Sequence, residues 1–138
     1  MTSGRPYSRS LEQLNSVGLR PTSQRMILAK ILFDGTNKHV TAEMLHQEAL
    51  KSQKKVSLAT IYNTLHLFTK LGLLREIIVD SDCCYFDTLT TNHHHFYRED
   101  TRELIDIDGS DIQIGHLPKP PEGSQITRID MVVRTKKI

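Results

Sequence analysis

Apolar residues recur at helical spacing through the first half of the chain, and small polar residues precede each apolar run. A helix is expected from Ser10 to Val17, and Gly18 ends it because glycine readily adopts the left-handed conformation that terminates helices. Thr22, Thr41 and Ser57 each precede a further apolar run and have side chains that cap helix N-termini. The inward-facing positions predicted for these three helices are Ile27, Leu28, Ile31 and Leu32; Met44, Leu45 and Ala49; and Leu58, Ile61, Leu65 and Phe68.

The period of the pattern changes after Gly72. Leu74–Val79 is a short run rich in Ile and Val, and the turn-forming residues 80–82 separate it from a second candidate strand, Cys84–Asp87. Helices followed by a hairpin are the order of a winged helix-turn-helix, in which one helix enters the DNA groove and the hairpin contacts the backbone. The sequence therefore predicts a winged-helix DNA-binding domain over residues 1–88, with residues 1–9 as a flexible arm.

Residues 89–138 show little helical pattern. Phe96-Tyr97, Glu103–Ile107 and Gln125–Arg134 are the candidate strands, and the prolines between the last two forbid a long helix. So little apolar mass in about 50 residues hardly forms a core alone, which favours a sheet shared in a homodimer. The predicted fold class is α+β, with the winged helix followed by a small α/β domain for dimerisation and ligand sensing.

Charge and cysteine content narrow the choice of compartment and partner. Residues 1–80 hold 11 Lys/Arg and 6 Asp/Glu, a net +5, whereas residues 81–138 hold 7 and 10, a net −3. A basic first part is expected if only that part contacts phosphates. There is no apolar run of the roughly 20 residues that span a membrane, no secretory signal and no disulfide framework, so a cytoplasmic protein is expected.

Polar side chains that suit DNA recognition gather at the starts of the second and fourth predicted helices. Arg20, Arg25 and Thr60 are candidate phosphate contacts, together with Lys54 and Lys55. Ser57, Tyr62 and Asn63 are candidate base contacts, because a recognition helix reads bases near its N-terminal end. Asparagine pairs with adenine through two hydrogen bonds, and a tyrosine ring packs on a thymine methyl group.

Three consecutive histidines, His93, His94 and His95, form the second chemical feature. In an extended segment His93 and His95 point to one side and His94 to the other. Imidazole binds Fe, Mn and Zn and is a common axial ligand of haem iron. His46, His66 and His116 are isolated and are interpreted as surface or core residues.

Several separated motifs together resemble the ferric uptake regulator family, most closely its iron response regulator (Irr) branch. They are Gly18-Leu19-Arg20-Pro21-Thr22-Ser23-Gln24-Arg25, His39-Val40-Thr41-Ala42-Glu43, Ser57-Leu58-Ala59-Thr60-Ile61-Tyr62-Asn63-Thr64-Leu65, His93-His94-His95-Phe96 and Leu117-Pro118-Lys119-Pro120-Pro121-Glu122-Gly123. The resemblance runs in order over residues 14–97 and more weakly to the C-terminus. It implies a homodimeric regulator that binds double-stranded operator DNA.

The resemblance also implies a regulatory site that takes one histidine from between the domains, one acid from the wing and histidines from the cluster. Those positions are His39, Asp87 and His95, with His93 or His94 as neighbours. Binding there would fix the relative orientation of the two parts. Cys-x-x-Cys pairs are absent, so a structural zinc of that type is not expected. Tyr97 and Phe96 replace a histidine and an acid of other members, which leaves room for haem held by histidine.

The function expected from this resemblance is control of iron homeostasis and haem biosynthesis genes in response to haem or iron. The alternative within the family is a repressor responsive to a divalent metal (Fe, Mn or Zn) or to peroxide. A metal-dependent hydrolase is disfavoured, because the chain has no Gly-rich loop, nucleophile motif or His-Glu-x-x-His helix. A metal-storage or interaction module without DNA binding is the third class. Charge reversal of Arg20 and replacement of Tyr62 would then leave the activity of the protein unchanged.

Overall fold

The helices of the first half begin at the residues that the sequence marks as caps. The computed structural model describes residues 6–80 and 82–138. Within them, α2 (Ser23–Leu32), α3 (Ala42–Lys51) and α4 (Leu58–Lys70) follow Thr22, Thr41 and Ser57. Each cap side chain accepts a hydrogen bond from the backbone N–H three residues on, at 3.4, 3.1 and 3.1 Å. The three predicted N-termini are therefore confirmed.

The first helix begins earlier than predicted. α1 spans Pro6–Ser16, so residues 6–9 of the expected arm are helical. Proline is well accommodated in the first turn of a helix, because its missing N–H would have no partner there and its φ is already helical. Residues 1–5 of that arm lie outside the described residues.

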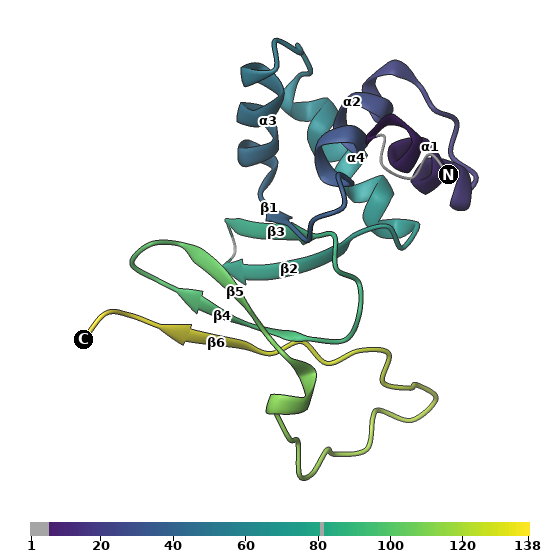
Figure 1. Cartoon of the computed structure of the whole chain (residues 1–138). Coiled ribbons are helices and arrows are strands. Elements are labelled where there is room, and N and C mark those ends of the chain that lie inside the picture. Colours follow the sequence, from purple (N-terminus) through teal and green to yellow (C-terminus); the bar gives the residue numbers. More distant parts are fainter. Residues whose placement is uncertain (1–5, 81) are drawn as a thin grey trace. The chain divides into compact units, whose positions relative to one another are not determined.

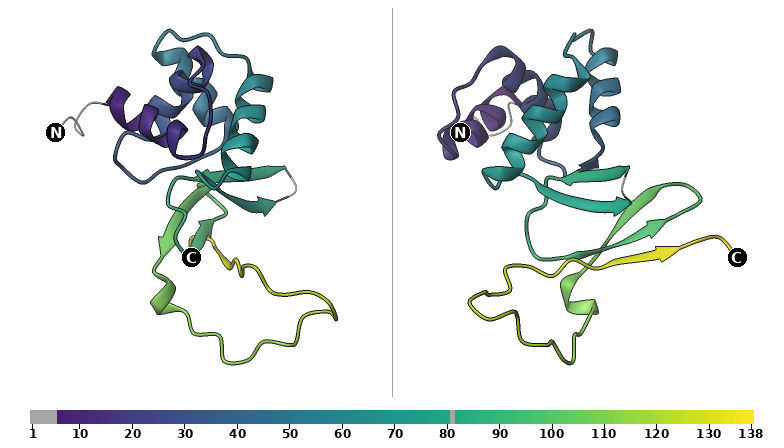
Figure 2. Two further views of the ribbon diagram at one scale, coloured as in Figure 1. Left: turned by 90° about the vertical axis from the view of Figure 1, so that its right-hand side faces the viewer. Right: turned by 180° about the vertical axis from the view of Figure 1, so that it is seen from behind.

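Gly72 ends α4 and directs the chain into the hairpin. Its φ of +84° lies in the left-handed region that favours glycine. The Leu73 N–H donates to the Phe68 carbonyl at 2.9 Å and the Gly72 N–H to the Thr69 carbonyl at 3.0 Å, which satisfies carbonyls at the helix end. Figures 1 and 2 show α4 leading directly into the first strand of the hairpin.

The hairpin and one short strand form the sheet of the first compact unit, Met1–Thr90. β2 (Arg75–Asp80) and β3 (Cys83–Asp87) pair antiparallel, which confirms the predicted wing. β1 (His39–Val40) pairs with the other edge of β3, giving the order β1-β3-β2. β1 was not predicted, because two residues are too few to show a strand pattern. It places His39 on the same sheet as Asp87.

The core of this unit lies between the helices and the sheet. Leu28, Leu45, Ile61, Leu65 and Phe68 are fully buried, as their spacing predicts. The prediction for Met44 is wrong, since this side chain is 46% exposed. The reason is that Ala42, Leu45 and Ala49 already occupy the inward stripe of α3, and Met44 lies beside it.

Phe68→Ala is expected to destabilise the first unit by about 3–5 kcal/mol, because it removes a large ring and leaves a cavity. Phe68 is fully buried, and its ring centroid lies 6.0 Å from that of Phe33. Urea unfolding followed by circular dichroism measures the change. The exposed apolar residue Met44 provides the control: Met44→Ala should change stability by about 0.5 kcal/mol or less. Equal effects of the two substitutions would contradict the assigned core.

The loop that leads from α2 to His39 is held by Asp34. Its carboxylate lies 2.9 Å from Lys38 Nζ and accepts hydrogen bonds from the Thr36 N–H and hydroxyl at 3.0 and 2.7 Å. Burial tends to raise the pKa of Asp34, but the hydrogen bonds from Lys38 and Thr36 outweigh it and hold the pKa at about 2. The charged carboxylate therefore stabilises the folded loop.

Asp34→Asn is expected to lower stability near neutral pH but not in strong acid. Because the folded pKa is below the ordinary value of 3.8, the stabilisation is present above that value and is lost as the pH falls toward 2. The side chain is 36% exposed, so the effect is below about 1 kcal/mol. Urea unfolding of both proteins at about pH 6 and pH 2.5 measures it. A difference that persists unchanged at the lower pH would contradict this assignment.

A second three-stranded sheet forms in the unit Thr91–Ile138. β4 (His94–Arg98) is central and pairs antiparallel with β5 (Glu103–Ile107) and parallel with β6 (Val132–Thr135). A short 3-10 turn, η1 (Gly109–Asp111), follows β5. The strands predicted at Phe96-Tyr97 and Glu103–Ile107 are confirmed.

The strand predicted over Gln125–Arg134 is wrong at its start, because β6 begins only at Val132. Figure 2 shows the preceding segment as a wide loop between η1 and β6. Ile126 is 48% exposed and Arg128 pairs locally with Asp130, so neither face of this stretch is buried as a strand requires. No helix of the described residues is long and apolar enough to cross a membrane.

Candidate metal centre and nucleic-acid interface

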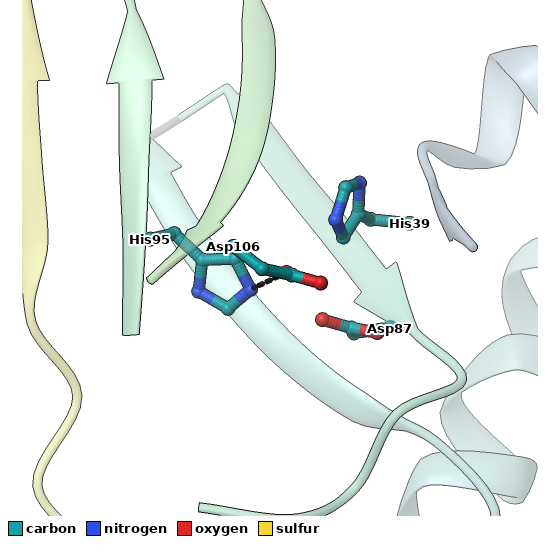
Figure 3. Close-up of side chains that lie close together, drawn as sticks. All are labelled: His39, Asp87, His95 and Asp106. Carbon is teal, nitrogen blue, oxygen red and sulfur yellow. Dashed lines mark ion pairs between the residues drawn. The ribbon is translucent and has the colours of Figure 1, made fainter. Parts of the chain in front are cut away.

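Two histidines and one acid converge within the second unit. His95 on β4 is the register partner of Asp106 on β5, and its Nε2 lies 3.2 Å from Asp106 Oδ1 (Figure 3). His93 Nε2 lies 3.4 Å from the same oxygen, and the two imidazole centroids are 4.5 Å apart. The alternation predicted for an extended segment thus directs both rings to one side, and a carboxylate joins them there.

The hydrogen bonding of His93 determines which of its ring nitrogens can bind a cation. Its Nδ1 lies 2.7 Å from the Thr91 carbonyl oxygen, and a carbonyl only accepts. Nδ1 must therefore be a donor, so in the neutral ring Nε2, the atom that faces Asp106, is the nitrogen that can bind a cation. His93 and His95 are 4% and 2% exposed, whereas the Asp106 side chain is 39% exposed. Both rings are therefore packed inside the second unit.

His94 points elsewhere. Its Nδ1 accepts a hydrogen bond from the Met131 N–H at 3.1 Å, on the side of β6. It is buried but does not join His93 and His95. Of the three clustered histidines named from the sequence, the structure brings two together and separates the third.

In the first unit, His39 and Asp87 form a pair on adjacent strands. They are register partners of β1 and β3, drawn in Figure 3. Asp87 is fully buried, and its Oδ1 accepts a hydrogen bond from the Leu89 N–H at 2.8 Å. His39 is half-buried. A buried carboxylate beside an imidazole is a second potential source of metal ligands.

Each unit thus offers imidazole nitrogens and carboxylate oxygens as potential ligands. Such ligands suit Fe²⁺, Mn²⁺ and Zn²⁺. Both cysteines, Cys83 and Cys84, are unoxidised and lie on β3. Burial raises the pKa of the Cys84 thiol to about 12, with Glu76 adding to the shift. That thiol therefore stays protonated at neutral pH and is unreactive.

Asp106 was not among the site residues predicted from the sequence. The signal was present, because Glu103–Ile107 was expected as a strand, and an acid within a strand can face a histidine on its neighbour. The sequence did not fix the register that pairs His95 with Asp106. Tyr97, which the resemblance places at a histidine position, is buried, and the Arg134 guanidinium lies 5.2 Å from its ring centroid. It has a packing role.

The candidate DNA-contacting residues lie around the N-terminal ends of α2 and α4. Ser57 and Asn63 are exposed, and Tyr62 is 37% exposed. The Ser57 hydroxyl donates to the Thr60 hydroxyl at 2.9 Å, so both remain at the start of α4. Arg20 precedes α2, and its carbonyl accepts a hydrogen bond from Arg25 Nη1 at 3.0 Å. These placements keep the named side chains on the surface of the first unit.

Comparison with known proteins identifies the family of this chain. The model of the ferric uptake regulator family matches residues 16–133. The peroxide-responsive repressor PerR of Staphylococcus saprophyticus is 29% identical over 119 residues, 86% of this chain and 74% of the relative. PerR of Staphylococcus aureus strain Mu50 is 31% identical over 98 residues, 71% and 66% of the two chains.

Two solved structures share the fold. The ferric uptake regulator of Pseudomonas aeruginosa with manganese has a TM-score of 0.70 and 22% identity, covering 93% of this chain and 97% of that one. A zinc-bound manganese uptake regulator has a TM-score of 0.66 and 21% identity, with coverages of 94% and 99%. The predicted α+β class is confirmed. With a family match over most of its length, this chain belongs to the ferric uptake regulator family.

Proposed function

We propose that this protein is a homodimeric transcriptional regulator whose affinity for operator DNA is set by a divalent metal ion. The observation that carries the proposal is the convergence of His93 Nε2, His95 Nε2 and Asp106 Oδ1 within the second unit. Two imidazoles and one carboxylate are the ligands that Fe²⁺, Mn²⁺ and Zn²⁺ take in proteins. The exposed side chains at the start of α4 support the proposed binding to DNA.

The same ion is proposed to draw ligands from His39 and Asp87 of the first unit. This extends the resemblance, which implies a ligand from each of the two parts of the chain. An ion that takes ligands from both units couples them, because it binds best where all its ligands meet. Metal binding then shifts the population toward the arrangement that binds the operator.

Dimerisation is proposed to use the second unit. Phe96 and its register partners Ile105 and Val133 lie side by side across the three strands. Phe96 and Ile105 are 40% and 36% exposed, an apolar row that a second copy of the chain would cover. A dimer also supports recognition of a two-fold symmetric operator with one α4 in each half-site.

A divalent ion fits the converging side chains better than haem does. Asp106 places a carboxylate beside both Nε2 atoms, and its negative charge suits a small cation. Haem remains the second candidate ligand, since the iron response regulator motifs and the buried His93–His95 cluster favour it. In that case the regulated genes are those of iron homeostasis and haem biosynthesis. The PerR relatives support peroxide-responsive repression as the third form of the proposal.

Binding of labelled promoter DNA by the metal-free protein distinguishes these forms. Fluorescence anisotropy at fixed salt is followed while Mn²⁺, Fe²⁺ or haem is added separately, because phosphate-driven affinity varies with salt. Binding that appears only with a divalent ion supports the favoured form, and its loss when peroxide reaches the Fe²⁺-loaded protein supports peroxide sensing. Binding without metal that haem abolishes would support the haem form and contradict the favoured one.

A further inference from the structure

The exposed ring of Tyr62 is held at its polar end by an acid from the neighbouring helix. Glu43 lies in the first turn of α3, and its Oε2 accepts a hydrogen bond from the Tyr62 hydroxyl at 2.8 Å. The two residues are 19 apart in the chain, so this contact belongs to the packing of α3 against α4 and not to α4 itself. Hydrogen bonding to this carboxylate raises the pKa of Tyr62, which keeps the phenol protonated as the donor.

The ring of Tyr62 also has a neighbour along α4. His66, one turn further, is stacked on it with ring centroids 6.4 Å apart and an interplanar angle of 18°. His66 in turn meets Phe86 of β3 edge-on, with centroids 5.5 Å apart, and its Nδ1 lies 3.6 Å from Glu76 Oε2 on β2. Phe86 is 1% exposed and belongs to the core. Tyr62 is thus supported from α3 at its hydroxyl and from the wing through His66.

The hydrogen bond to Glu43 decides what Tyr62 presents to a partner. A phenol has one donor hydrogen, and here Glu43 takes it. The hydroxyl therefore has no donor left for a base, whereas the apolar ring can still pack on a thymine methyl group. We infer that Glu43 is a positioning residue that orients Tyr62 so that its ring, and not its hydroxyl, reads the operator. This inference rests on the proposed DNA-binding function.

The expected size of the effect follows from pre-organisation. An exposed tyrosine that is free to rotate must be ordered when DNA binds, whereas a ring already held by Glu43 and His66 is ordered beforehand. Immobilising one side chain lowers affinity by about two- to tenfold. Binding of random-sequence DNA depends on phosphate contacts and not on ring placement, so it should change little. The ratio of operator to random affinity is the sensitive quantity.

The test compares five variants of the full chain, each loaded with Mn²⁺, on operator and random DNA. Glu43→Ala and Tyr62→Phe each remove the hydrogen bond and should each lower the affinity ratio by about two- to tenfold. Their combination should lose no more than either alone, because both break the same contact. Glu43→Gln keeps an oxygen acceptor and should restore most of the loss. Glu48→Ala, an exposed acid further along α3, is the matched control and should leave the ratio unchanged.

Additive losses in the double variant, or a Tyr62→Phe loss far larger than that of Glu43→Ala, would overturn the inference, because the hydroxyl would then contact DNA itself. Unchanged ratios in both single variants would also overturn it. A second readout needs no DNA: the ultraviolet titration of Tyr62 should move toward its ordinary pKa in Glu43→Ala. Wild-type protein that binds no operator would instead contradict the proposed function, while that titration still tests the contact.

Discussion

His95→Ala is expected to weaken Mn²⁺ binding by more than about a hundredfold. Loss of a residue that only supports a metal ligand already weakens binding by about 10- to 100-fold, and His95 is proposed to be a ligand itself. Its Nε2 faces Asp106 from a position only 2% exposed, so water cannot easily take its place. Asp106→Asn should lower affinity in the same direction, because it removes the negative charge beside both imidazoles. Isothermal titration of the metal-free protein with Mn²⁺ measures both effects.

His94→Ala is the matched control for that experiment. It removes a buried histidine from the same strand, but one whose Nδ1 accepts the Met131 N–H. Metal affinity should stay close to that of the wild type, with a loss of stability only. Replacing all three clustered histidines together should abolish the metal response while the first unit keeps the side chains proposed to bind DNA. A loss in His94→Ala as large as in His95→Ala would show that the ligand assignment is wrong.

Tyr62→Ala is expected to lower operator affinity by about tenfold or more while leaving Mn²⁺ affinity unchanged. The whole ring is removed from an exposed position near the N-terminal end of α4, where a recognition helix contacts bases. A good base contact contributes about 1–3 kcal/mol of discrimination, and 1.4 kcal/mol corresponds to tenfold. Random-sequence DNA should bind almost as well as before. Anisotropy titrations on both kinds of DNA, with Mn²⁺ titrations alongside, measure the change.

Arg20→Ala supplies the contrast to Tyr62→Ala. Arg20 is exposed just before α2 and is proposed to contact a phosphate. Its removal should weaken operator and random DNA alike and reduce the slope of log affinity against log salt by about 1. If Tyr62→Ala weakened metal binding as strongly as DNA binding, the proposed division of labour between the two units would be wrong.

Much of the first unit was predictable because its signals are local. Thr22, Thr41 and Ser57 cap helices through hydrogen bonds that span three residues, and a cap is visible in any window of that size. The wing was visible for the same reason, as two β-rich runs around a turn. Met44 was misplaced because its helix carries small alanines on the inward face, where hydrophobicity alone gives little contrast with the neighbouring positions.

The candidate site was harder to predict from the sequence, because its geometry depends on strand register. His93 and His95 were found from their spacing alone. Asp106 was missed, because only pairing of β4 with β5 brings it opposite His95. Likewise, β1 is too short to be seen in the sequence, yet it sets His39 opposite Asp87. The Glu43–Tyr62 hydrogen bond depends on helix packing and has no local signature.

The most direct test of the central claim is a Mn²⁺ titration of wild type, His39→Ala and His95→Ala in the presence of operator DNA, with bound metal and bound DNA followed together. We expect a single class of bound Mn²⁺ ion whose affinity both substitutions lower. DNA binding should then need correspondingly more Mn²⁺ in each variant. Unchanged metal affinity and unchanged metal dependence of DNA binding in His39→Ala would contradict it, because the ion would then belong to the second unit alone.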